Sequence, residues 1–186
     1  ETRAINLTPP DVFSPIITIN SPAPNGVYLN ASSVLFNITL NEVTDPVWYW
    51  INNSAINYTM SNVTLFNYNA TNTSISDGNY GVTFYANDTS GNVGSVSSNF
   101  SIDTARPLIS YGIGTENNGM NKSQNWIYVN VSVAEINILF TNFTLYNSSG
   151  LVNATNFSDG TLEFNWTNLE DNNYEYNVTV VDKAGN

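Results

Sequence analysis

The chain has 186 residues with four basic and fifteen acidic side chains, a net charge of −11 that excludes the cationic surfaces used to bind nucleic acid or anionic membranes. It contains no Cys and no His, which excludes disulfides, Cys/His zinc sites and catalytic triads with an imidazole base. Asn, Ser and Thr make up 71 residues, and 41% of the chain is hydrophobic, so we expect a folded chain with a neutral, hydrogen-bonding surface.

Alternating apolar side chains predict short β-strands along the whole chain. The first alternating segment is Ala4–Thr8, followed by strands at residues 34–40, 80–86, 93–102, 127–133, 162–166 and 174–180. Turn signals such as Asp77-Gly78, Ser149-Gly150 and Asp159-Gly160 separate these strands at short intervals. No segment longer than ten residues has the 3.6-residue period of a helix. The pattern predicts an all-β protein with about seven strands in each domain.

An internal repeat divides the chain. Residues 77–92 match residues 171–186 at an offset of 94, with six identities in sixteen positions. A repeat of this length indicates whole small domains rather than a solenoid. We therefore predict two tandem immunoglobulin-like β-sandwiches: an N-terminal segment over residues 1–10, domain 1 over 11–103 and domain 2 over 104–186.

Short motifs carry a family resemblance. Asp77-Gly78-Asn79-Tyr80 and Asp171-Asn172-Asn173-Tyr174 resemble the tyrosine corner that opens strand F of immunoglobulin-like domains. Trp48 and Trp50 stand where strand C of that family carries its core Trp. Together with the segment before Pro107, these motifs resemble the tandem modules of prokaryotic, notably archaeal, surface and adhesion proteins. The resemblance implies a fold and an extracellular setting, with hardly any specific activity.

The two repeats end differently. Domain 1 continues past Asn92 into the strand at 93–102, whereas the chain stops at Asn186, the residue aligned with Asn92. We therefore expect domain 2 to lack its last strand, G. A candidate replacement is the N-terminal strand of a neighbouring copy, formed by Ala4, Ile5, Asn6, Leu7 and Thr8.

A residue count supports that register. Asn92 to Pro107 spans 15 residues, as does Asn186 across a head-to-tail junction to Pro15 of the next copy. Ile5 and Leu7 fall one residue out of phase with Val96 and Phe100, so the pairing requires a bulge or a different register. The same count fits one period of a longer covalent array, and arbitrary truncation or an unstructured leader are further alternatives.

Asn-X-Ser/Thr sequons are about two and a half times more frequent than the composition predicts. Alternating polar residues in strands account for some of them, but not for those expected in loops, and we predict dense N-glycosylation on the outer surface. The 18 acceptors are Asn6, Asn30, Asn37, Asn52, Asn57, Asn62, Asn69, Asn72, Asn87, Asn99, Asn121, Asn130, Asn142, Asn147, Asn153, Asn156, Asn165 and Asn177.

Two further sets of residues carry weaker hypotheses. Asp11, Asp88, Asp103 and Asp182 recur at equivalent places and could supply oxygen ligands to a structural Ca²⁺, although Asp is also a good turn residue. Trp48, Tyr49 and Trp50 could form a sugar-stacking platform, but alternation places Tyr49 on the opposite face from both Trp, so one side should be core. Trp126 and Trp166 are expected to pack in the interior.

No stretch approaches the roughly 18 apolar residues of a membrane span, and no signal peptide is present, so we expect a secreted chain whose signal has been removed. The leading expectation is a non-enzymatic, glycosylated subunit of an extracellular filament without cofactors, whose partners are copies of itself joined head to tail. The alternative is a stalk segment of a long tandem adhesin or surface-layer protein. An enzyme is the third reading, because no base or metal cluster is evident.

Overall fold

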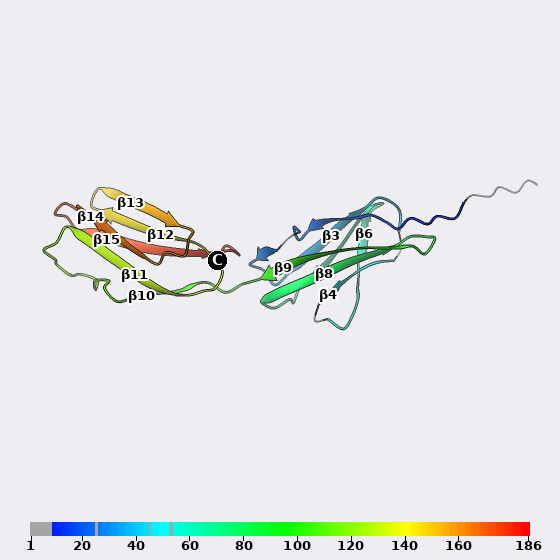
Figure 1. Ribbon diagram of the computed structural model, residues 1–186, viewed down its shortest axis with the longest axis horizontal. Helices are drawn as coiled ribbons and strands as arrows, with labels where there is room; N and C mark the ends of the chain where they lie inside the picture. The colour runs from blue at the N-terminus through cyan, green and yellow to red at the C-terminus, as the bar shows by residue number, and fades with distance from the viewer. Residues whose placement is uncertain (1–8, 25, 45, 53) are drawn as a thin grey trace, which may run out of the picture. The chain divides into compact units, whose positions relative to one another are not determined.

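The computed structural model describes residues 9–24, 26–44, 46–52 and 54–186. The chain divides into two compact units, Glu1–Thr104 and Ala105–Asn186, which we describe separately. All regular secondary structure among the described residues is β-strand (Figure 1). The prediction of two tandem β-sandwiches is therefore confirmed.

Unit 1 is a sandwich of two sheets. The four-stranded sheet has the order β1 (Ile17–Ser21), β3 (Val34–Leu40), β7 (Asn67–Asn72) and β6 (Ser61–Thr64). The five-stranded sheet has the order β2 (Val27–Leu29), β9 (Val93–Ile102), β8 (Gly78–Asn87), β4 (Val47–Ile51) and β5 (Tyr58–Thr59). Figure 1 shows the two layers, with β8 and β9 side by side. The strand predicted at 93–102 is present as β9.

Aromatic side chains from both sheets form the core of unit 1. The ring of Tyr49 stacks on that of Phe36, with centroids 4.5 Å apart, and the side chain of Tyr49 is 1% exposed. Trp48 and Trp50 flank Tyr49 in β4 and point to the opposite face of the sheet, because side chains alternate along a strand. The expectation that one of these Trp residues occupies the core position is wrong: Tyr49 occupies it.

Both predicted tyrosine corners are present. The hydroxyl of Tyr80 donates to the carbonyl of Ser76 over 2.8 Å, and that of Tyr174 donates to the carbonyl of Glu170 over 3.0 Å. Each hydrogen bond reaches back four residues, as in immunoglobulin-like sandwiches. The resemblance in sequence thus reflects the same local structure in both units.

Unit 2 has two three-stranded sheets. One has the order β10 (Leu108–Tyr111), β11 (Trp126–Ala134) and β14 (Glu163–Thr167). The other has the order β13 (Gly150–Phe157), β12 (Ile138–Asn147) and β15 (Tyr174–Asp182). Phe143 and Leu145 are fully buried between them, and Trp166 is buried as predicted. Trp126 is 39% exposed, so its expected place in the interior is wrong.

The two units differ at one edge. In unit 1, β8 has β4 on one side and β9 on the other, whereas β15, the equivalent of β8 by the repeat, pairs with β12 alone in the part of the chain that the structure describes. The first strands of the two units also differ. Ile17 in β1, two residues after Pro15, is 9% exposed, but Ile109 in β10, two residues after Pro107, is 40% exposed. Unit 2 therefore presents an unpaired strand edge and a less covered apolar margin.

Candidate functional site

The proposed sugar platform is only partly assembled. Trp48 stacks on Tyr85, with centroids 5.3 Å apart and ring planes 9° apart, on the outer face of the five-stranded sheet. Trp50 is 36% exposed, and its Nε1 donates to the carbonyl of Ser54 over 3.0 Å. Tyr49 lies in the core and cannot take part. The outer face thus retains two Trp and one Tyr as aromatic surface.

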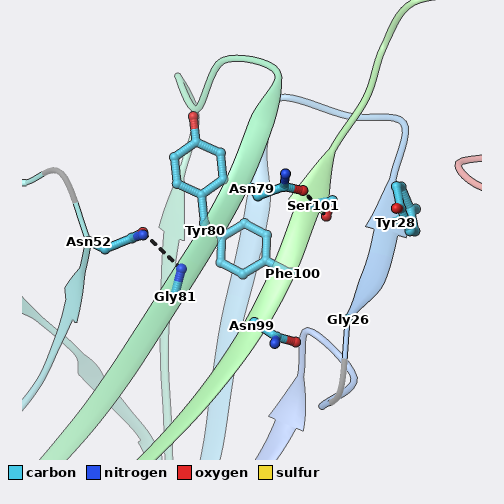
Figure 2. A pocket seen from close by; sticks show the side chains of 9 residues that line it. All are labelled: Gly26, Tyr28, Asn52, Asn79, Tyr80, Gly81, Asn99, Phe100 and Ser101. Carbon is cyan, nitrogen blue, oxygen red and sulfur yellow. Dashed lines mark hydrogen bonds between the residues drawn. The ribbon is translucent and has the colours of Figure 1, made fainter. Parts of the chain in front are cut away.

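A hollow of about 390 Å³ lies on unit 1 where β2, β8 and β9 meet the residues after β4 (Figure 2). The amide of Asn52 crosses to Gly81, whose N–H donates to Asn52 Oδ1 over 2.8 Å. On the other side, the hydroxyl of Ser101 donates to Asn79 Oδ1 over 2.6 Å. The lining consists of amide, hydroxyl and aromatic residues without a charged side chain: Gly26, Tyr28, Asn52, Asn79, Tyr80, Gly81, Asn99, Phe100 and Ser101.

Unit 2 has a hollow of similar chemistry, with a volume of about 440 Å³, on strands β11 and β14. Its lining residues are Gly114, Asn125, Trp126, Tyr128, Asn165 and Thr167. The hydroxyl of Tyr128 donates to Glu163 Oε2 over 2.5 Å, which fixes the phenol ring. This hydrogen bond, with some burial, raises the pKa of Tyr128 above its ordinary value of 10.0.

Three carboxylates gather in unit 1. Asp11, Glu42 and Asp88 each place an oxygen within 4.8 Å of the others. Asp11 is exposed, Glu42 half-buried and Asp88 buried. Hard oxygen ligands suit Ca²⁺, which takes six to eight of them. Two predicted residues, Asp11 and Asp88, therefore do come together, and the Ca²⁺ hypothesis stays a prediction.

Asp88 has a turn-forming role of its own. Its Oδ1 accepts the N–H groups of Ser90 and Asn92, both over 2.8 Å, and its Oδ2 accepts Nδ2 of Asn92 over 2.7 Å. Burial by itself raises the pKa of Asp88, but the hydrogen bonds from Asn92, Ser90 and Gly91 outweigh it, and the net pKa is lowered. The carboxylate form is thus stabilised by the turn.

The remaining Asp candidates lie at strand ends. Asp182 ends β15 and repeats this turn, since its Oδ1 accepts the N–H groups of Ala184 and Asn186, both over 2.9 Å. Asp103 directly follows β9, and its N–H donates to the carbonyl of Leu29 over 2.9 Å. Glu42 did not emerge from sequence reasoning. The repeat could have indicated it, because Glu135 stands 93 residues further on, close to the offset that links Asp88 with Asp182.

The sequons fall into two groups by exposure. Nine acceptors are exposed: Asn30, Asn57, Asn62, Asn99, Asn121, Asn153, Asn156, Asn165 and Asn177. Eight are half-buried: Asn37, Asn52, Asn69, Asn72, Asn87, Asn130, Asn142 and Asn147. Asn6 lies outside the described residues, as does the whole predicted donor strand Ala4–Thr8.

Among the described residues, no helix is long and apolar enough to cross a membrane. No protein-family model matches the sequence, and the comparison with curated proteins gave no match.

Comparison with solved structures gave clear matches in fold. The fibronectin(III)-like modules of Clostridium thermocellum CbhA match with a TM-score of 0.54 and 15% identity, covering 91% of this chain and 87% of that one. A tetra-tandem repeat from the extending region of a large adhesion protein matches with a TM-score of 0.37 and 19% identity, covering 93% of this chain and 46% of that one. Latent PorU from Porphyromonas gingivalis matches with a TM-score of 0.44 and 12% identity, covering 97% of this chain and 20% of that one. At 15% identity, the first match shows a shared fold.

The two tyrosine corners and the first match show the fold: two tandem β-sandwiches of the immunoglobulin and fibronectin III type.

Proposed function

We propose that the chain is a spacer segment of an extracellular surface protein, part of a longer series of sandwich modules that holds a binding region away from the cell. One observation carries this proposal: two successive units repeat one plan, down to the tyrosine corner and the Asp-centred turn. Repetition of a module lengthens a protein without requiring a new site in each copy.

The surface chemistry supports this role. The described strands of unit 1 carry no charged side chain, and amide and hydroxyl groups lie on their outer faces beside the aromatic surface of Trp48, Trp50 and Tyr85. We propose no catalytic activity for the chain, because His and Cys are absent and the recurring carboxylates Asp88 and Asp182 serve turns. A spacer needs to stay folded and soluble, and it does not need a dedicated reactive site.

Dense N-glycosylation is part of the proposal. Nine exposed sequons in a chain without disulfides would add hydrated bulk and shield strand edges from pairing with other chains. Sequon density without Cys suits the exterior of an archaeal cell. Glycopeptide mass spectrometry of the native protein should find several occupied sites, and a bare polypeptide would contradict this part of the proposal.

The spacer role predicts the result of an in-frame deletion of residues 11–186 from the native gene. The shortened protein should still reach the surface and bind its target in a purified assay. Its reach from the cell, measured by labelling its outer end in electron micrographs, should be shorter. Loss of target binding by the purified deletion protein would show that these modules form the binding site and are not a spacer.

A second candidate is a filament subunit completed by donor-strand exchange. The unpaired edge of β15 favours it, because unpaired backbone groups next to an apolar margin attract an added strand. Deleting residues 1–8 should then abolish filaments and destabilise unit 2 while unit 1 stays folded. Appending those eight residues after Asn186 should give a self-complemented monomer. Continued polymerisation of both variants would contradict this candidate.

A further inference from the structure

Each of the two hollows has an Asn-X-Ser/Thr sequon in its wall. In each, both polar residues of one sequon form part of the wall: Asn99 and Ser101 in unit 1, and Asn165 and Thr167 in unit 2. Residues i and i+2 of a strand point to the same side, so the acceptor amide and its hydroxyl partner face one space. Both acceptors belong to the exposed group.

Aromatic side chains lie directly beside the sequon in unit 2. In the register of β11 and β14, Asn165 is paired with Tyr128, and Thr167 with Trp126. Side chains paired across strands have Cβ atoms about 5 Å apart. A sugar joined to Nδ2 of Asn165 therefore lies next to the phenol ring, and its neighbour along the strand is the indole of Trp126, which is 39% exposed.

Gly114 lies against an aromatic ring at the edge of the unit 2 hollow. Gly114 has φ +94°, and a Cβ there would lie 2.9 Å from Cε1 of Tyr128, so the backbone approaches the ring more closely than any side chain permits. Together with the hydrogen bond from the phenol to Glu163, this contact holds the Tyr128 ring in one orientation. Contacts within the protein thus hold the phenol ring of Tyr128 in place.

Unit 1 shows a related arrangement. Asn99 of β9 is paired with Gly81 of β8, and Ser101 with Tyr28 of β2. A Cβ on Gly81 would meet only Asn52, whose Cγ is 3.8 Å and Nδ2 3.9 Å away, so the missing side chain leaves the space between Asn52 and Asn99 open (Figure 2). Asn52 Oδ1 accepts the N–H of Gly81, so this amide is held in place beside the hollow.

The chemistry of both walls matches a neutral saccharide. A sugar ring offers an apolar C–H face to aromatic rings and hydroxyl groups to amides, and it carries no charge that would need a counter-ion. No charged side chain lines either hollow. Volumes of about 390 and 440 Å³ fall at the small end of the range for ligand sites, about 300–1,000 Å³.

We propose that the hollows seat the first sugars of the chain's own N-glycans, with the Asn165 glycan lying on Trp126 and Tyr128 and the Asn99 glycan lying over Gly81. This inference rests on the proposed glycosylation and adds a structural role for two glycans. It also accounts for the exposure of Trp126, because the glycan covers an indole that the protein leaves open.

The test in unit 2 is a double-mutant cycle on the full chain, expressed through a secretory route that glycosylates Asn-X-Ser/Thr. Thr167→Val removes the sequon with little change of shape and keeps Asn165, and Trp126→Ala removes the stacking surface. Trp126→Ala should lower the Tm of unit 2 by about 4 °C more in the glycosylated background than in the Thr167→Val background. Nuclear Overhauser contacts between sugar protons and the indole of Trp126 should be present in the glycosylated chain.

Unit 1 supplies a matched variant. Gly81→Val fills the hollow without backbone strain, since the φ of Gly81 is not in the left-handed region and the nearest atom is 3.8 Å from the new Cβ. Contacts between the Asn99 glycan and the backbone of residue 81 should disappear in Gly81→Val, while the contacts of the Asn165 glycan with Trp126 stay unchanged.

A titration distinguishes the chain's own glycans from an external saccharide as the occupant of the hollows. Unglycosylated chain titrated with chitobiose or mannobiose should show amide shifts at Gly81 and Tyr128, whereas chain glycosylated at Asn99 and Asn165 should show none. Shifts of the same size in occupied chain would overturn the proposal in favour of an external saccharide. Empty sequons at Asn99 and Asn165, or occupied sequons with additive mutations and no sugar–indole contacts, would also overturn it. None of these results bears on the spacer role, which the deletion of residues 11–186 tests separately.

Discussion

Tyr49 lies in the core of unit 1, at the position where the family pattern predicts a Trp. Its ring stacks on Phe36 and on Tyr58, with centroid distances of 4.5 and 4.9 Å. Burial and the nearby Tyr58 raise the pKa of Tyr49 to about 12, although a hydrogen bond with Asn72 acts in the opposite direction. The fold therefore favours the neutral phenol.

This shift predicts alkaline destabilisation of unit 1. Above pH 10.0, the ordinary pKa, the phenol of Tyr49 ionises in the unfolded chain, while the folded chain keeps its proton up to about pH 12. The contribution of Tyr49 is therefore fully present below pH 10 and is lost between pH 10 and 12. Thermal unfolding followed across that range should show a falling Tm, and Tyr49→Phe should flatten the fall. Equal slopes for wild type and Tyr49→Phe would contradict the assignment.

The faces of the strands show the limit of sequence reasoning at this scale. Period-two alternation correctly separated Tyr49 from Trp48 and Trp50, but it does not state which face is inside. The family pattern favoured a core Trp, whereas the core position of β4 is taken by Tyr49, which packs among Phe36 of β3 and Phe84 of β8, with Phe100 of β9 against Phe36. Only the packing of residues far apart in sequence decides this.

At the scale of elements, β9 closes unit 1 by close contact with the segment before β1. Gly94 is buried, and a Cβ placed on it would lie 2.1 Å from the carbonyl oxygen of Pro15. The φ of Gly94 is not in the left-handed region, so space and not strain requires glycine here. This contact is the counterpart of the margin that stays uncovered in unit 2.

Gly94→Ala should therefore destabilise unit 1 by about 1–3 kcal/mol, because the methyl group forces β9 away from Pro15. Gly81→Ala in the neighbouring strand is the matched control, since its Cβ meets only Asn52 at ordinary contact distance. We expect that control to be neutral or slightly stabilising, because alanine restricts the unfolded chain. Urea unfolding of both variants measures the difference, and similar midpoints would show that β9 does not pack as described.

The Ca²⁺ hypothesis can be tested on the turn that follows β8. If Asp11, Glu42 and Asp88 bind the ion, Ca²⁺ should raise the Tm of unit 1 and EDTA should reverse the rise. Asp88→Asn should then lower the Tm and remove the response to Ca²⁺. If Asp88 serves the turn alone, the variant should lose the same stability with and without Ca²⁺, and wild type should not respond.

The order of elements was largely predictable, because a repeat and period-two alternation are local patterns. The strands at residues 34–40 and 93–102 agree with β3 and β9 residue for residue. The hollows were not predictable. The unit 1 hollow depends on Gly81 of β8 standing opposite the sequon residue Asn99 of β9, and the unit 2 hollow depends on Gly114, in the turn after β10, approaching Tyr128 of β11. Such neighbours become visible only once the register and the packing are known.

At the scale of the whole molecule, one sandwich plan occurs twice in succession, and we propose that this repetition builds length. The two units share their corners and turns, while the two hollows differ in detail and the edge of β15 has no counterpart in unit 1. A spacer in a longer series and a subunit of a filament both use this plan. They differ in whether covalent or non-covalent junctions join successive pairs of units.

The mass of the native polypeptide after removal of its glycans distinguishes these two cases most directly. An antibody raised against residues 9–104 would detect it on a denaturing gel after boiling, which separates strands held by non-covalent pairing. The spacer proposal predicts a polypeptide much larger than the 20.4 kDa of this chain. A single species of about that mass would contradict the spacer proposal and would support the filament subunit.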